Sequence, residues 1–205
     1  MMSRHPSING PLKLAVLGSG RGTNLRAILE AIHAGTLPAI VVAVASDNPD
    51  AGILKIAEAH GIHAHHIPQG PFKTKLTPEI ETALASHLLS FQPDLIVLAG
   101  YMRMIGSPLL QAFPQRVVNV HPSLLPAFPG LAAWEQALIA KVSETGCTIH
   151  FVDSGMDSGP IIAQQRVPVL PDDTPTSLHA RIQSAEHQLY SETLGRFANG
   201  LLPLP

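Results

Sequence analysis

The segment KLAVLGSGRGTNLRAILEAIHAG, residues 13–35, changes its hydrophobic period once and thereby decides the fold. Residues 13–17 form a short apolar run, which breaks at the glycine-rich loop of residues 18–22. From there apolar side chains recur at the helical spacing of three or four residues, at Leu25, Ile28, Leu29 and Ile32. Gly35 follows as a stop signal for a helix. The segment therefore predicts a strand, a glycine loop and a helix in succession.

The same alternation of strand and helix continues along the chain. Strands are predicted at residues 40–45, 63–67, 95–99 and 116–120, and helices at residues 51–60, 78–90 and 107–113. Continuous apolar strands separated by helices are typical of a parallel sheet that is covered on both faces. We therefore expect a doubly wound, Rossmann-like α/β fold with a mostly parallel sheet.

The last third of the chain breaks this alternation. Residues 147–152 and 161–169 are strand-like, and the polar, glycine-rich residues 153–160 join them without a helix. Such a short connection predicts an antiparallel strand near the C-terminal end of the sheet. A final helix is predicted at residues 174–199. Because no repeat or interdomain linker is visible, we expect a single domain over residues 1–205, with residues 1–11 disordered.

The composition argues against several classes of protein. With 205 residues, of which 45% are hydrophobic, the chain can bury one substantial core. Charged residues make up 14% and the formal net charge is −2, without a dense basic run, which disfavours nucleic-acid binding. The apolar runs are far shorter than the roughly 20 residues that span a bilayer, and no signal peptide is evident. We expect a cytoplasmic protein away from membranes, with Cys147 as a buried structural thiol.

Residues that follow strands are the first candidates for function, because ligands of such sheets bind outside the carboxyl ends of the strands. The amides of Gly22, Thr23 and Asn24 open the first predicted helix, where free N–H groups and the helix dipole favour a phosphate. Thr23 stands where a dinucleotide fingerprint has its third glycine, which weakens an NAD site despite Asp47 after the second strand. On these residues alone, a tight turn without a ligand is an equal alternative.

The sequence VVNVHPSLLP, residues 117–126, is a second candidate. Because side chains alternate along a strand, Asn119 and His121 point to the same face at the strand's end. A lone histidine there is most simply a satisfied structural side chain. The neighbouring amide and the proline-stiffened loop favour a functional site instead. A serine nucleophile is disfavoured, because Ser123 lacks the G-x-S-x-G elbow.

Asp157, in the loop of residues 153–160, is the third candidate. An aspartate in a turn often only caps its own backbone, and Asp153 of the same loop could do so equally well. The local pattern does not decide which of the two carboxylates has a chemical role.

Five motifs carry a resemblance to a known family. They are, in chain order, GSGRGTNLRAIL, LAGYMRM, NVHPSLLPAFPG, GCTIHFVDSGMDSGPII and RIQSAEH. With these motifs the chain resembles the phosphoribosylglycinamide formyltransferases, folate-dependent enzymes of purine biosynthesis, from about residue 14 to residue 200. Methionyl-tRNA formyltransferases and formyltetrahydrofolate deformylases share the N-x-H-P-S-L-L-P motif, but they carry a further domain for which this chain has no room.

The resemblance implies the formyltransferase fold and transfer of a formyl group from the co-substrate 10-formyltetrahydrofolate to the amine of glycinamide ribonucleotide, without a metal. It assigns catalysis to Asn119, His121 and Asp157. The remaining assignments are Gly22, Thr23, Asn24, Gln183 and Glu186 for glycinamide ribonucleotide, and Met102, Arg103, Met104 and Ile105 for the folate. A deformylase-like hydrolase and a nucleotide-binding module without catalysis are the alternatives. The expected partners are these small molecules, and the sequence does not decide between a monomer and a homodimer.

Two positions depart from the family pattern. Ala132 and Trp134 stand where the family commonly carries histidines, so the contribution of this segment to the site changes. An arginine of the folate-side loop is also replaced, with Lys73 or Lys75 as the nearest cation. Contacts to the glutamate tail of the folate are therefore expected to differ.

A histidine-rich segment is a further candidate, for a metal site. It contains His60, His63, His65 and His66. Because no cysteine accompanies them at the usual ligand spacing, we favour a solvated histidine-rich edge over a zinc site.

Overall fold

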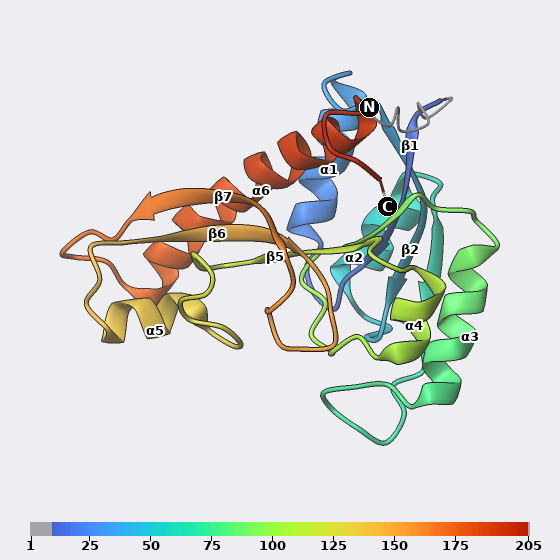
Figure 1. The fold of residues 1–205 in the computed structure, drawn as a ribbon, viewed down its shortest axis with the longest axis horizontal. Helices are drawn as coiled ribbons and strands as arrows, with labels where there is room; N and C mark the ends of the chain where they lie inside the picture. The colour runs from blue at the N-terminus through green and yellow to red at the C-terminus, as the bar shows by residue number, and fades with distance from the viewer. Residues whose placement is uncertain (1–9, 205) are drawn as a thin grey trace, which may run out of the picture.

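The computed structural model describes residues 10–204 of the chain (Figure 1). The predicted disorder of residues 1–11 falls mostly outside this range, and Gly10 and Pro11 form a bend before the first strand. Within the described range the elements follow in the order β1 (Leu12–Leu17), α1 (Thr23–His33), β2 (Ala39–Ser46), α2 (Gly52–Ala59), β3 (His63–His66), α3 (Pro78–Leu89), β4 (Leu95–Leu98), α4 (Ser107–Ala112), β5 (Val117–His121), α5 (Ala133–Ile139), β6 (Glu144–Phe151), β7 (Ile161–Pro168) and α6 (Pro175–Ala198).

The strands form one seven-stranded sheet in the order β3-β2-β1-β4-β5-β6-β7. Neighbours from β3 to β5 pair in parallel, whereas β6 is antiparallel to both β5 and β7. Within the described sheet, β6 alone runs against the other strands. The predicted fold class, a doubly wound and mostly parallel α/β sheet with an antiparallel strand near the C-terminal end, is confirmed. The strand order reverses between β1 and β4, where sheets of this type open a crevice at their carboxyl ends.

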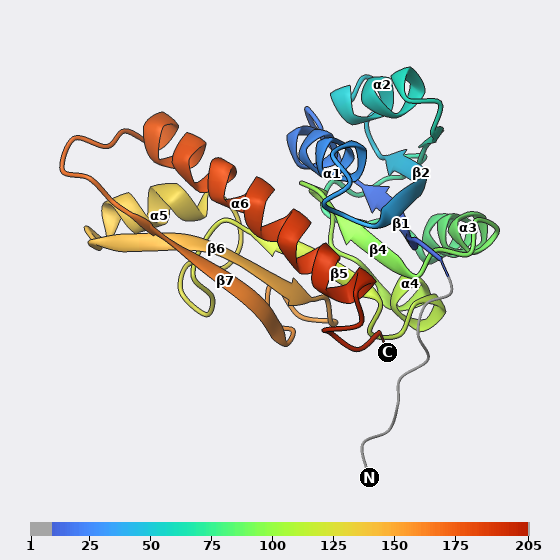
Figure 2. The same ribbon diagram turned by 90° about the horizontal axis from the view of Figure 1, so that it is seen from above.

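Helices cover both faces of the sheet (Figure 2). Helices α1, α2 and α6 pack over one core, and α3 and α4 pack over the other. Alternate side chains of β1 enter alternate cores, with Val16 in the first and Leu17 in the second. Burial on both faces explains why these strands are continuous apolar runs in the sequence.

The helix boundaries follow local sequence signals. Before α6, the Thr174 hydroxyl accepts the amide hydrogen of Ser177 at 3.1 Å, while the Ser177 hydroxyl accepts that of Thr174 at 2.9 Å. This reciprocal pair satisfies two amides that have no partner inside the helix. Past the end of α1, Gly35 has a φ of +73°, a left-handed conformation that glycine adopts at little cost.

Two features of the C-terminal half were not predicted. Helix α5 is preceded by Ala132, which has a φ of +51° and provides no side-chain cap, so the sequence carries no start signal. Strand β6 begins at Glu144, earlier than its apolar run, because pairing with β7 extends to the register Glu144↔Pro168. Pairing with a partner strand, rather than local hydrophobicity, fixes that end.

The composition led to two expectations, one about membrane-spanning segments and one about Cys147. No helix within residues 10–204 has both the length and the apolar character that crossing a bilayer requires. Cys147 is fully buried in β6, and burial raises the pKa of its thiol to about 12. The thiol is therefore protonated at neutral pH, as a structural cysteine should be.

Candidate active site

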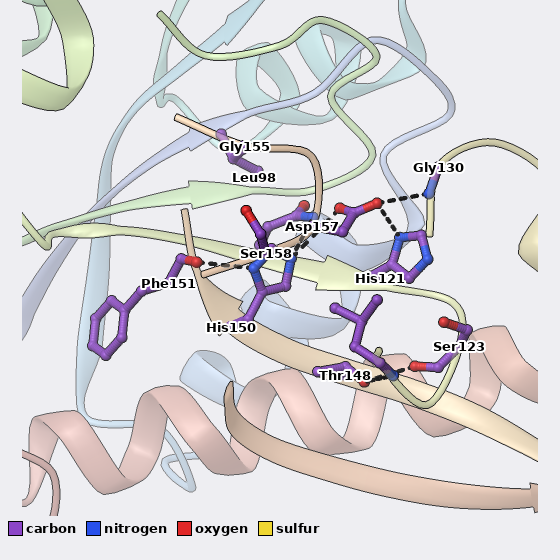
Figure 3. A network of polar contacts seen from close by, with 12 residues as sticks. Leu98, His121, Ser123, Gly130, Thr148, His150, Phe151, Gly155, Asp157 and Ser158 are labelled. Atoms are coloured by element: carbon purple, nitrogen blue, oxygen red, sulfur yellow. Dashed lines mark hydrogen bonds and ion pairs between the residues drawn. The ribbon is translucent and has the colours of Figure 1, made fainter. Parts of the chain in front are cut away.

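Asn119 and His121 alternate on β5, so both lie on one face of the sheet at its end. Figure 3 shows His121 there, close to Asp157. His121 is 4% exposed and Asn119 is half-buried. The antiparallel register with β6 places Asn119 opposite His150. Opposed residues of neighbouring strands project to the same face, so His150 joins the pair. Sequence reasoning missed His150, whose position in the GCTIHF run becomes informative only once the β5–β6 register is known.

The loop of residues 153–160 folds back over this face and brings Asp157 to the histidines. Its Oδ2 atom accepts the amide hydrogen of Gly130 at 2.8 Å and lies 3.3 Å from Nδ1 of His121. Its Oδ1 atom lies 3.7 Å from Nε2 of His150. The structure thus brings Asn119, His121 and Asp157 together at one site.

Asp153, the other carboxylate of the loop, is engaged locally. It accepts the Gly155 amide hydrogen at 3.0 Å and the Ser158 hydroxyl hydrogen at 2.8 Å. Asp157, by contrast, has a φ of +52°, which costs a residue other than glycine roughly 1 kcal/mol. The loop therefore holds Asp157 in an unfavourable backbone conformation while its carboxylate faces His121.

The neighbours of each imidazole indicate where its protons lie. Nε2 of His121 is 2.8 Å from the carbonyl oxygen of Phe128, and its Nδ1 faces the Asp157 carboxylate. Both neighbours are acceptors, and only the doubly protonated ring offers a hydrogen to each. Protonation at both nitrogens would therefore let His121 donate to both acceptors at once.

His150 is in the opposite situation. Its Nδ1 donates to the carbonyl of Phe151 at 2.9 Å, which leaves a lone pair on Nε2 for the Asn119 amide at 3.2 Å. Burial lowers the pKa of His150, although the Phe151 carbonyl and Asp157 act in the other direction. A neutral His150 thus fixes the Asn119 amide, whose second N–H forms no hydrogen bond within residues 10–204.

A buried network fixes the loop that follows β5. The Thr148 hydroxyl donates to the carbonyl of Ser123 at 2.6 Å and accepts the amide hydrogen of Leu125 at 3.0 Å. Ser123 itself is fully buried, and its hydroxyl donates to the carbonyl of Ala127 at 2.5 Å. Its hydrogen is therefore already committed, in agreement with the low expectation for a serine nucleophile.

The glycine loop leads directly into α1. Gly22 precedes the helix with a φ of +80°, and a Cβ atom there would lie only 2.8 Å from Cα of Ile53. Only glycine fits this conformation and this close approach to α2. Within residues 10–204, none of the amides of Gly22, Thr23 and Asn24 donates a hydrogen bond. The helix start therefore offers free donors and the positive end of its dipole.

Helix α6 contributes side chains to the same place. Gln183 donates to the Thr23 hydroxyl at 3.1 Å, and Asn24 donates to the Glu186 carboxyl at 3.4 Å. Glu186 is 6% exposed, and burial raises its pKa to about 7. The five residues predicted to contact glycinamide ribonucleotide thus lie together, although the sequence separates them by more than a hundred positions.

Trp134, one of the departures from the family pattern, also faces α6. Its ring stacks on His179 with centroids 3.8 Å apart and an interplanar angle of 13°. Burial lowers the pKa of His179, and the nearby charge of Arg21 acts in the same direction. The tryptophan therefore packs α5 against a neutral histidine at the start of α6.

The segment after β4 contains the residues predicted to line the folate pocket. Met102 and Met104 are 61% and 44% exposed, whereas Ile105 is buried. Phe72, 47% exposed, comes from the neighbouring loop, which pairs with this segment through Lys75 and Met104. Three large apolar side chains thus lie exposed on adjoining segments, where a flat ring could cover them.

Arg103, from the same predicted set, has its guanidinium in a structural role. Its Nε atom lies 2.6 Å from Oδ2 of Asp47, and its Nη1 atom donates to the carbonyls of Phe72 and Lys75. Asp47 also accepts the Ser19 hydroxyl hydrogen at 2.6 Å. Nε and Nη1 of Arg103 and both carboxylate oxygens of Asp47 are thus engaged within the protein.

Comparison with known proteins identifies the family. A model of the formyl transferase family matches residues 12–194. The phosphoribosylglycinamide formyltransferase of Haemophilus influenzae is 39% identical over 196 residues, which are 94% of this chain and 90% of that protein. The crystal structure of glycinamide ribonucleotide transformylase 1 from Symbiobacterium toebii has a TM-score of 0.87 at 47% identity, over 93% of this chain and 89% of that chain.

A more distant likeness shows how widely the fold is shared. The structure of a formyltetrahydrofolate deformylase from Pseudomonas syringae has a TM-score of 0.85 at 24% identity, over 94% of this chain and 63% of that chain. This likeness concerns the fold alone. The matches described above confirm the predicted enzyme class, formyl transfer in purine biosynthesis, and the chain belongs to the phosphoribosylglycinamide formyltransferase family.

Proposed function

We propose that the site at the end of β5 transfers the formyl group of 10-formyltetrahydrofolate to the amine of glycinamide ribonucleotide. The observation that carries this proposal is the convergence of Asn119, His121 and Asp157, with 3.3 Å between Nδ1 of His121 and the Asp157 carboxylate. An amide donor, a cationic imidazole and a carboxylate are the groups that a transfer between two nitrogens requires.

The proposed reaction begins when the amine nitrogen attacks the formyl carbon. As this bond forms, the carbonyl oxygen gains negative charge, which the Asn119 amide and the His121 imidazolium stabilise by donating hydrogen bonds. The attacking nitrogen becomes acidic, and Asp157 takes up its proton through water. As the oxyanion re-forms the carbonyl, the bond from carbon to the folate nitrogen breaks, and Asp157 returns the proton through water to that nitrogen as it leaves.

The topology supports the placement of both substrates. Strands β1, β4 and β5 are parallel neighbours, so the segments after them meet at one edge of the sheet. The free amides of Gly22, Thr23 and Asn24 would bind the phosphate, with Gln183 and Glu186 beside the ribose and amine. Met102 and Met104, together with Phe72, would cover the folate ring, while Ile105 supports them from the core and Arg103 holds the segment in place.

An acceptor-dependent assay tests the proposal. Release of tetrahydrofolate is followed spectrophotometrically with glycinamide ribonucleotide present and then omitted. We expect saturable release only with the amine acceptor. Release without it would mean that water is the acceptor, as in the deformylase alternative, and binding without release would identify a non-catalytic nucleotide-binding module.

The proposal includes further properties that call for separate measurements. Because side chains carry every step, we expect a chelator such as EDTA to leave turnover unchanged. Loss of turnover in EDTA would show that the reaction depends on a metal. We also place the reaction in the cytoplasm, where neither nucleic acid nor a membrane takes part. Sedimentation would decide between the monomer and the homodimer.

A further inference from the structure

Three histidines from two elements meet at the edge of the sheet, far along the strand order from β5. His63 and His65 alternate on β3, so their side chains project to the same face of this edge strand. His87 comes from α3 and packs against that face. Strands β2, β1 and β4 separate this cluster from the reaction centre.

The three rings are close enough to share one ion. One ring nitrogen from each histidine lies within 4.8 Å of the other two. The rings of His65 and His87 are stacked with centroids 4.1 Å apart, and those of His63 and His87 are 5.2 Å apart. Ring nitrogens at these separations need to move by less than about 1 Å to reach a zinc–nitrogen distance of roughly 2.0–2.1 Å.

One nitrogen of the cluster is unsatisfied within the described chain. Nε2 of His87 is shielded from solvent, and no group of residues 10–204 forms a hydrogen bond with it. Leaving a shielded polar atom without a partner costs about 1–3 kcal/mol. A metal ion, which accepts the lone pair of an imidazole nitrogen, would satisfy it.

The charge state of the rings suits metal coordination. Burial lowers the pKa of both His65 and His87, and the neighbouring histidines act in the same direction. A lowered pKa favours the neutral form of the His65 and His87 rings, which is the form that binds metals.

We propose that His63, His65 and His87 bind one divalent transition-metal ion, with Zn²⁺ as the probe, and so join β3 to α3. Three imidazoles suit Zn²⁺, Ni²⁺ and Cu²⁺, whereas Mg²⁺ and Ca²⁺ require oxygen ligands. Because His63 is exposed, water can reach a fourth coordination position. The site is separate from the formyl-transfer chemistry, for which no metal is proposed.

This site differs from the one considered in the sequence. His60 forms a contact of 2.9 Å with the carbonyl of Ile56 through Nδ1, and His66 points to the other face of β3. His87, which the sequence analysis did not include, takes their place. The third ligand therefore comes from α3 and not from the histidine-rich segment.

Calorimetric titration of the tag-free, EDTA-treated protein with Zn²⁺ tests the proposal. We expect saturable binding of about one ion per chain, weakened at least ~10-fold by either His65→Gln or His87→Gln. His66→Gln, the matched control on the same strand, should stay within about 2-fold, since it removes no ligand. MgCl₂ at the same concentrations should give no saturable signal.

Three results would overturn the proposal: no binding by the wild type, undiminished binding by both variants, or loss of binding in Asp157→Asn. The last result would place the ion at the reaction centre instead. If a variant does not fold, imidazole ¹H–¹⁵N spectra of the wild type answer the question. Zn²⁺ should then shift the signals of His63, His65 and His87 before that of His121, and the reverse order would contradict the site.

Discussion

The two halves of the active site use different chemical groups, side chains in one and backbone amides in the other. The reaction centre consists of polar side chains on an antiparallel strand pair, completed by a carboxylate whose backbone has a φ of +52°. The glycine-loop half consists of backbone amides at the start of α1, in the parallel part of the fold, which side chains of α6 support. Side chains can be replaced one at a time, whereas amides stay with the backbone. Substitutions in the reaction centre should therefore lower turnover. Substitutions in the glycine-loop half should instead change KM or the free energy of unfolding.

The largest expected effect tests the reaction centre. Asp157→Asn keeps the shape of the side chain but removes its charge and its ability to take up a proton. We expect turnover to fall at least ~100-fold, the scale of a lost acid–base group, while KM for glycinamide ribonucleotide changes far less. Steady-state kinetics measure both quantities. Asp153→Asn in the same loop is the matched control, and turnover near normal in Asp157→Asn would refute the assignment.

The next effect concerns Glu186, the carboxyl of the glycine-loop half. Burial raises its pKa to about 7 from a usual value of 4.5, so the folded protein holds a proton that the unfolded chain releases between these values. The free energy of unfolding should therefore fall as the pH rises through this window. Glu186→Gln cannot ionise and should remove about 2 kcal/mol of the decrease between pH 5 and pH 8.

Urea unfolding at both pH values, for wild type and Glu186→Gln, measures that difference. Glu192→Gln is the matched control, because it also removes one carboxylate from α6. Gln188→Glu would not serve, because it adds a charge. Parallel pH profiles for wild type and Glu186→Gln would mean that the buried carboxyl does not govern the stability of this half.

A smaller effect is expected for His150, which positions Asn119 without touching substrate. His150→Leu removes the acceptor of the Asn119 amide, so turnover should fall about 10-fold, the scale of one hydrogen bond. His150→Gln provides an amide oxygen as acceptor and should recover part of the rate. If both variants are equally slow, His150 does not act through the Asn119 hydrogen bond.

The smallest effect tests the binding half. Gln183→Ala removes one neutral hydrogen bond to Thr23, so KM for glycinamide ribonucleotide should rise roughly 3-fold with turnover unchanged. Initial rates at varied glycinamide ribonucleotide concentration measure this. A loss of turnover without a change in KM would mean that the two halves are not separable in the way their construction suggests.

Local patterns were sufficient where one element determines the outcome. The strand and helix alternation gave the α/β class, and the alternation of β5 placed Asn119 and His121 on one face. The glycine loop gave the start of α1, because Gly22 provides the left-handed φ of +80° that precedes the helix. In each case the information lies within a few neighbouring residues.

Tertiary contacts decided the remaining features. Asp153 and Asp157 are equivalent as turn residues, and only the fold of their loop onto Gly130 and His121 separates them. His150 depends on the β5–β6 register, and His87 depends on the packing of α3 against β3. The buried pairing of Arg103 with Asp47 likewise joins two segments that no local pattern connects.

The reversal of direction at β6 determines how the sheet ends. Because β7 returns beside β6 without a crossover helix, the sheet closes on an eight-residue strand that has no further neighbour in the described fold. An open edge of this kind can template the addition of an extended chain, the first step of many aggregation reactions. Arg166 puts a charge on β7, and Pro168 ends it with a residue that lacks an amide hydrogen. The strand reversal that brings His150 beside Asn119 thus also leaves an open strand edge exposed to self-association.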